Sequence, residues 1–190
     1  MSDVVGVELS ADAVRAVSLD AWRATPRVTV EVPWDPERPA DAVRALRERL
    51  GETNRIALSV GLAFLHIKHV KLPPAPVEER RRIIAFEPDR FFPVQDEPLV
   101  VSLVSEENLA FAVDAAAVDR WIAAFEVWAP VESVEPSPLS LARALGPSVR
   151  HDTFELPAGS DERGLVELVE GHVHAARRVR GARPWRQHRR

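Results

Sequence analysis

Strand-like and helix-like spacings of hydrophobic residues follow one another in the first 60 residues of the chain. Val43, Leu46 and Leu50 recur at the spacing of a helix, which Gly51 is placed to end. The stretches with strand character are 4–19, which holds two runs around a polar turn at 10–12, then 27–32 and 55–60. The first block is therefore predicted to be β-β-β-α-β.

A second block of elements extends to residue 145, and prolines punctuate it. Proline has no backbone N–H, so the block at 73–76 is expected to stop the preceding strand, and Pro88 to end or kink the helix after it. Ser137 is expected to cap the last helix, with Pro138 in its first turn. The expected elements are a strand at 64–72, a helix at 77–87, a hairpin of 98–104 and 108–114, a helix at 115–128, a strand at 130–136 and a helix at 137–145.

The last part of the chain carries weaker patterns. Residues 150–156 are compatible with a strand, and 157–164 with a turn or linker. Residues 165–179 hold two alternating runs joined at Glu170 and Gly171, which predicts a hairpin.

Charge separates the C-terminal end from the rest. The chain has 190 residues and a net charge of −4, but residues 177–190 hold seven arginines and no acid, leaving a body with 18 basic and 29 acidic residues. A basic end is commonly a solvated tail, and arginines with a tryptophan are also typical of the cytoplasmic side of a bilayer. The acidic body disfavours nucleic acid as a partner. The membrane-proximal candidates are Arg177, Arg178, Arg180, Arg183, Trp185, Arg186, Arg189 and Arg190.

Composition excludes several kinds of chemistry. There is no cysteine, which excludes disulfides, thiolate metal sites and a cysteine nucleophile. His66 and His69 would face opposite sides of a strand, whereas His172 and His174 share a face without a nearby acid, so no metal site is predicted. No apolar run reaches 18 residues, and the first residues lack the pattern of a secretory signal peptide.

Several motifs stand in a recognisable order. A hairpin near Gly6 precedes β-α-β, an inserted block follows, and residues 131–145 then form a strand and helix. The motif positions in the inserted block are Leu72-Pro73-Pro74, Glu78-Glu79, Ile83-Ile84, Phe86-Glu87 and Phe92-Pro93. This order resembles the PilM family of type IV pilus assembly proteins and the related GspL cytoplasmic domain of type II secretion, over roughly residues 1–145.

The resemblance implies an α/β fold with a mixed sheet: an actin-like (RNase H-like) first lobe with an inserted small α/β subdomain. The core subdomain is expected at 1–62 and 130–176, the inserted subdomain at 63–129, and a basic tail at 177–190. Phe91, Phe92 and Pro93 are expected to anchor the end of the charged helix, either in the core or lining a groove. The partner-binding candidates are Leu72, Pro73, Phe86, Phe91 and Phe92.

The family's first phosphate loop is altered in this chain. Its pattern is Gly-x-Asp-x-Gly followed by a lysine, whereas here Gly6 is followed by Glu8, by Ser10 near the missing loop glycine, and by Arg15 near the lysine position. After residue 145 no second phosphate loop is apparent, "ELPAGSDERG" being the nearest stretch. We therefore expect no catalytic residues, no ATPase activity and no bound ATP or other cofactor.

By resemblance, the chain is expected to be a non-catalytic scaffold or adaptor of a type IV pilus or type II secretion platform. PilM binds a short cytoplasmic segment of the membrane protein PilN between its first and inserted subdomains, and GspL-like domains bind the secretion ATPase. The expected location is the cytoplasm at the inner-membrane face, with homodimerisation left open. If the chain is cut from a longer fusion, an apolar run of about 20 residues is expected after Arg190. The alternatives are a reduced actin-like ATPase completed by a partner subunit and an unrelated α/β binding module.

Overall fold

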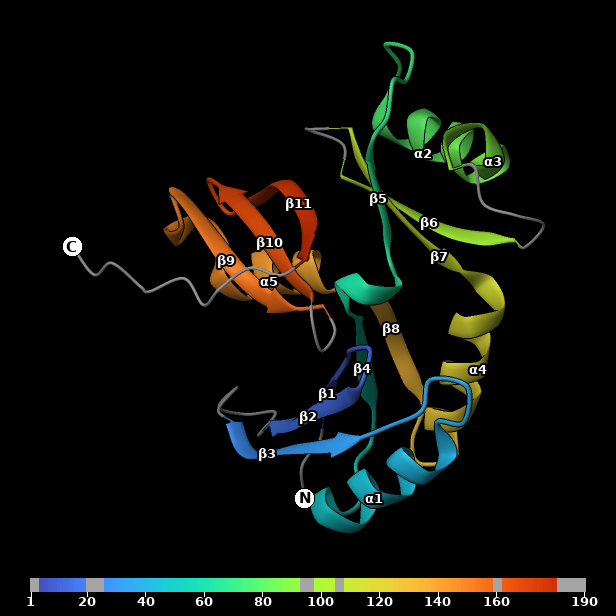
Figure 1. The fold of residues 1–190 in the computed structure, drawn as a ribbon, viewed down its shortest axis with the longest axis vertical. Helices are drawn as coiled ribbons and strands as arrows, with labels where there is room; N and C mark the ends of the chain where they lie inside the picture. Colours follow the sequence, from blue (N-terminus) through green and yellow to red (C-terminus); the bar gives the residue numbers. More distant parts are fainter. Residues whose placement is uncertain (1–3, 20–25, 93–97, 105–107, 159–161, 181–190) are drawn as a thin grey trace.

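Three β-sheets and the helices between them make up the fold (Figure 1). The computed structural model describes residues 4–19, 26–92, 98–104, 108–158 and 162–180. The largest sheet has five strands and is mixed, because β1 pairs antiparallel with β2 but parallel with β4. Its strands, in spatial order, are β3 (Pro26–Pro33), β2 (Ala13–Leu19), β1 (Val4–Leu9), β4 (Ile56–Val60) and β8 (Val131–Pro136).

Two helices, α1 (Ala40–Leu50) and α4 (Ala115–Glu126), lie beside each other against this sheet (Figure 1). The apolar face of α4 belongs to the core: Trp121 is 2% exposed and Phe125 is fully buried. Trp121 also donates a 3.0 Å hydrogen bond to the carbonyl of Pro36. Burial of such large side chains is the main favourable term in folding, so this helix fixes the sheet's covered face.

The second sheet belongs to the inserted block and lies at the far end of the molecule from α1 (Figure 1). It is antiparallel, and its strands in order are β5 (His66–His69), β7 (Leu109–Asp114) and β6 (Leu99–Val104). The helices α2 (Val77–Phe86) and α3 (Pro88–Phe91) cover it around a separate apolar cluster that includes Ile84 and Phe92. The Lys68 ammonium ties α3 to β5 by donating to the carbonyl of Phe91 at 2.8 Å.

The third sheet follows α5 (Ser137–Leu145) and the 3₁₀ turn η2 (Gly146–Ser148). It is an antiparallel meander of β11 (His172–Arg180), β10 (Glu162–Val169) and β9 (His151–Pro157). The 3₁₀ turn η1 (Leu62–Phe64) packs against it: a Cβ on Gly164 would lie 1.9 Å from Cδ1 of Leu62. Val166, Leu168 and Val173 join the main core, so this sheet is attached through apolar contact.

The predicted order of elements is confirmed, and the differences lie at element ends. The strand expected at 64–72 is shorter in the structure, because Phe64 is the last residue of η1 and packs against Trp121, with the two rings tilted and their centroids 4.8 Å apart. Proline ends α2 as predicted, since α3 begins at Pro88. The capping role of Ser137 was wrong: Pro136 precedes α5 without a side-chain cap, and Ser137 is its first residue.

Candidate functional site

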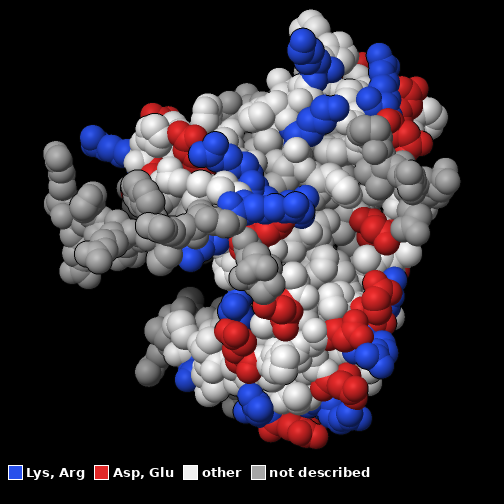
Figure 2. All heavy atoms as spheres, viewed as in Figure 1, with Lys and Arg blue, Asp and Glu red and all other residues white. Residues whose placement is uncertain are grey.

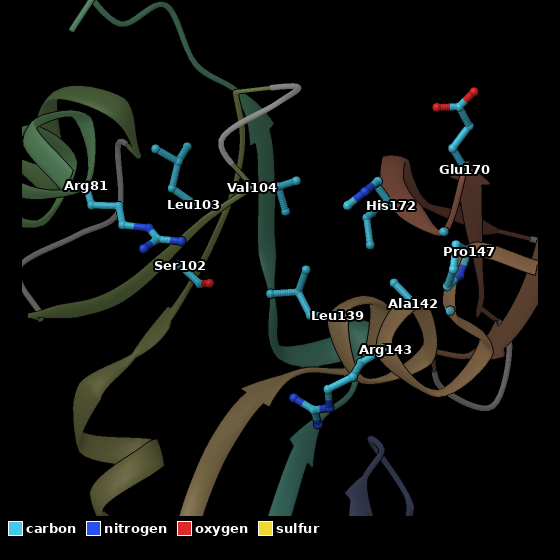
Figure 3. A pocket seen from close by; sticks show the side chains of 13 residues that line it. Arg81, Ser102, Leu103, Val104, Leu139, Ala142, Arg143, Pro147, Glu170 and His172 are labelled. Carbon is cyan, nitrogen blue, oxygen red and sulfur yellow. The ribbon is translucent and has the colours of Figure 1, made fainter. Parts of the chain in front are cut away.

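A groove lies where α5, the inserted sheet and the third sheet meet (Figure 3). Its volume is about 590 Å³. Three parts of the chain that are far apart in sequence converge on it, which is the kind of junction where proteins commonly place binding sites. The lining residues are Arg81, Ser102, Leu103, Val104, Leu139, Ala142, Arg143, Gly146, Pro147, Glu170, Gly171, His172 and Val173.

The floor of the groove is α5, and a polar network holds this helix on the main sheet. The Ser140 hydroxyl donates to Glu135 at 2.6 Å and lies 3.0 Å from the hydroxyl of Ser59. Arg143 donates to the same Glu135 carboxylate with two nitrogens, one of them at 2.6 Å. Because Glu135 is at the carboxyl end of β8 and Ser59 is on β4, the network fixes α5 against two neighbouring parallel strands.

One wall of the groove is the tip of the β10–β11 hairpin. Glu170 and Gly171 both have positive φ, 50° and 79°, and the Glu170 amide donates to the carbonyl of Arg150 at 2.8 Å. The tip rests on η2 so closely that a Cβ on Gly171 would lie 2.6 Å from the Gly146 carbonyl oxygen. Glycine has no such atom, so the hairpin and the turn after α5 can pack backbone to backbone.

The opposite wall is β6, with Arg81 of α2 beside it. Figure 3 shows the Arg81 guanidinium, the Leu139 side chain and the His172 ring all directed toward the space between the walls. Arg81 is half exposed and pairs with Glu78 one turn earlier at 2.9 Å. The groove therefore offers an apolar floor flanked by cations, with one carboxylate, Glu170, at the hairpin tip.

The altered phosphate-loop positions lie elsewhere, on the main sheet. Gly6 and Glu8 alternate with the buried residues of β1, so they face away from the core. Glu8, Arg15 and Glu31 are register partners on three adjacent strands, and Arg15 donates to Glu31 at 2.7 Å and lies 3.5 Å from Glu8. Burial would lower the pKa of the Arg15 guanidinium, but these two carboxylates raise it. Because the carboxylates of Glu8 and Glu31 largely neutralise the Arg15 guanidinium, it would attract a phosphate only weakly.

The turn that would carry the loop is filled by internal hydrogen bonds. The hydroxyl of Ser10, which is fully buried, donates to the carbonyl of Ala13 at 2.7 Å. Trp34 donates its indole N–H to the carbonyl of Ser10 at 2.7 Å. The amide of Gly61 donates to the carbonyl of Leu9 at 2.8 Å, and a Cβ there would lie 2.3 Å from this oxygen. These contacts make the region a packed turn.

The predicted partner-binding residues are divided by the structure. Phe91 and Phe92 are 8% and 3% exposed and belong to the small core, which fits their interpretation as core anchors, whereas Phe86 is 86% exposed. Leu72 packs at the edge of that core. Pro73, Phe86 and Phe91 line a cavity of about 430 Å³ beside α2 and α3, not the groove of Figure 3. Pro93 lies outside the described residues.

The predicted basic tail begins inside a strand. Arg177, Arg178 and Arg180 belong to β11, so the assignment of these three to a tail was wrong. The pairing of β11 with β10 runs through these arginines and continues up to Arg180. The other membrane-proximal candidates, Arg183, Trp185, Arg186, Arg189 and Arg190, lie outside the described residues. Within the residues that the structure describes, no helix is long and apolar enough to cross a membrane, and no group of histidines and acids could hold a metal ion.

Sequence reasoning did not find the groove residues. The pattern around Leu139 and Ala142 is typical of an ordinary apolar helix face, and the polar residues at the hairpin tip predict only a turn. The available signal was the Gly146-Pro147 turn after α5 and the Glu170-Gly171 turn, two tight turns that bracket the third sheet. Their proximity depends on long-range packing.

The fold is shared with proteins of two bacterial assemblies. The cytoplasmic domain of EpsL, an inner-membrane component of the type II secretion system of Vibrio cholerae, matches with a TM-score of 0.69 and 13% identity over 93% of this chain and 71% of that one. A PilM-PilN type IV pilus biogenesis complex matches with a TM-score of 0.72 and 17% identity over 94% of this chain and 61% of that one. A Bacteroides thetaiotaomicron protein with an actin-like ATPase fold gives a TM-score of 0.55 at 11% identity, over 94% of this chain and 70% of that one.

No protein-family model and no curated protein sequence matches the chain. At these identities the structural matches establish a shared fold. They confirm the predicted actin-like architecture and, at the level of the fold, the predicted resemblance to PilM and to a type II secretion cytoplasmic domain.

Proposed function

We propose that this chain is a non-catalytic scaffold domain of a type IV pilus or type II secretion assembly platform. It binds a short cytoplasmic segment of a PilN-like membrane protein, and so works at the cytoplasmic face of the inner membrane. The observation that carries the proposal is the groove between α5, β6 and the hairpin tip, in a chain whose fold matches that of a PilM-PilN complex. A contact with the assembly ATPase is a further part of the same proposal.

The groove suits a peptide better than a nucleotide. Its floor is apolar at Leu139 and Ala142, and its charged residues are Arg143 on the same helix, with Arg81 and Glu170 on the two walls. Arg143 is bound to Glu135, and Arg81 to Glu78, so both cations are already partly neutralised. A segment of alternating apolar and polar residues would bury its apolar side chains on α5, whereas a triphosphate would meet cations with acids beside them.

A binding experiment tests this assignment. The cytoplasmic segments of the source organism's pilus and secretion inner-membrane proteins are made as fluorescein-labelled peptides and titrated with the chain. One of them is expected to bind. Leu139→Glu and Arg81→Glu are expected to weaken this binding by about tenfold or more, since the first places a charge on the apolar floor and the second reverses the charge of a wall residue. Arg82→Glu is the matched control, because this neighbouring exposed residue of α2 does not line the groove. Equal loss in Arg82→Glu, or no bound segment, would contradict the proposal.

A further inference from the structure

A second groove lies between the edges of two strands, and its lining residues differ from those of the groove in Figure 3. β5 is the outer strand of the inserted sheet, β11 is the outer strand of the third sheet, and a cavity of about 440 Å³ lies between them. The Arg178 guanidinium ties β11 to η1, the turn that precedes β5, by donating to the carbonyl of Ala63 at 3.2 Å. Among the described strands, none pairs with the outer edge of β5 or of β11. Both are therefore edge strands of the described sheets, the positions at which a further strand can pair.

The groove is strongly cationic. Arg177, Arg178 and Arg180 line it with one acid, Glu162, which leaves an excess of two positive charges. Glu162 accepts a 2.6 Å hydrogen bond from Arg180 and lies 3.8 Å from Arg178. The Arg177 side chain is exposed, and no hydrogen bond or ion pair joins it to any part of the chain that the structure describes. Figure 2 shows Lys and Arg side chains gathered on the surface where β11 lies in Figure 1.

We propose that this groove binds an acidic polypeptide segment in extended conformation, which pairs with the free edge of β11 or β5. The strand edge supplies backbone hydrogen bonds, and the arginines select carboxylates. Leu65, Ile67 and Ala176 form the apolar part of the lining, so the segment alternates acidic and apolar residues, as a strand does. A phosphate polymer or a lipid surface would satisfy the arginines but not the strand edges.

The proposed occupant is a segment of a second polypeptide. Residues 181–190, which follow β11 directly, contain four arginines and no acidic residue, so like-charge repulsion disfavours them as the occupant. The site is independent of the groove that carries the proposed function, because none of its lining residues is shared with that groove.

Fluorescence anisotropy of a labelled (Glu-Val)₄ peptide tests the site on the full chain. We expect saturable binding of this peptide, none of (Lys-Val)₄, and binding of (Glu-Pro)₄ weaker by about tenfold or more, because proline cannot donate to a ladder. Hydrogen exchange of β5 or β11 amides is expected to slow when (Glu-Val)₄ binds. Equal binding of (Glu-Pro)₄ would mean charge attraction alone and would overturn the strand pairing.

Variants distinguish peptide binding in the groove from binding to the arginines of residues 181–190. Arg177→Ser, which removes a side chain without a hydrogen bond, and the double variant with Arg180→Ser are expected to weaken (Glu-Val)₄ binding, the double variant by about tenfold. Glu162→Gln is expected to tighten it several-fold, since it removes the one acid of the groove. Replacing Arg183, Arg186, Arg189 and Arg190 by serine is the matched control and should leave it unchanged. Loss in this control but not in the groove variants would overturn the proposal, as would stronger binding of (dT)₈ or anionic vesicles that depends on the same arginines.

Discussion

A Cβ atom on Gly171 would lie 2.6 Å from the carbonyl oxygen of Gly146, so the tip of the β10–β11 hairpin and the turn after α5 touch backbone to backbone. Both glycines have positive φ, 79° and 60°. The contact fixes the hairpin wall of the peptide groove relative to its helical floor. The geometry of the proposed binding site therefore depends on two residues that carry no side chain.

Gly171→Ala is expected to destabilise the fold. The alanine must adopt a left-handed backbone conformation, and its methyl group must displace the Gly146 backbone. Together these should lower the free energy of unfolding by about 2–3 kcal/mol. Gly51→Ala is the matched control: it has the same φ of 79° but nothing within 4 Å of the new Cβ. Urea unfolding of both variants measures the difference, and equal losses would show that the close contact has no energetic effect.

The two kinds of phenylalanine in the inserted block should behave differently. Phe92→Ala opens a cavity in the small core and is expected to cost about 3–5 kcal/mol. Phe86→Ala removes a side chain that is 86% exposed and should change the unfolding free energy by no more than about 0.5 kcal/mol. Thermal and chemical unfolding compare them. A large loss in Phe86→Ala would mean that this residue is covered in solution.

The ion pair at the start of β10 predicts a pH dependence. The hydrogen bond from Arg180 lowers the pKa of Glu162 below its ordinary value of 4.5; burial opposes this effect, and the charges of Arg180 and Arg178 add to it. A carboxyl with a lowered pKa stabilises the fold above its unfolded-state pKa, and this contribution is lost as pH falls through the folded-state value.

Glu162→Gln should therefore lower the melting temperature slightly at pH 7 and change it less at pH 2, because the wild-type carboxyl loses its charge as the pH falls. The pair is exposed, so the effect at pH 7 should shrink further in high salt. Scanning fluorimetry at both pH values measures it. An equal difference at pH 7 and pH 2 would assign the effect to packing.

Local patterns were sufficient to predict the elements but not their assembly. The alternation before and after Glu170-Gly171 predicted the hairpin, because a glycine at positive φ suits a tight turn. The same alternation extends through Arg177 to Arg180, and their charge led to the tail assignment although an exposed edge strand accepts arginines readily.

The binding candidates were harder to predict for a physical reason. Leu72, Pro73 and the phenylalanines were grouped because they are neighbours in sequence, but α2 ends at Phe86 and Pro88 starts α3, so Phe86 points outward while Phe92 is buried. The groove of Figure 3 places Arg81 and His172 on opposite walls, where α5, the inserted sheet and the third sheet meet. No local spacing in the sequence encodes this arrangement.

The most direct test of the central claim is a thermal-shift titration with the partner peptide and, separately, with ATP and magnesium. A ligand that binds the native state raises the melting temperature by mass action, and the rise grows with ligand concentration. The account predicts a concentration-dependent rise with the peptide, lost in Leu139→Glu, and no change with ATP. A rise with ATP that is lost in Glu8→Ala, with none from the peptide, would contradict the scaffold assignment and favour a nucleotide-binding protein.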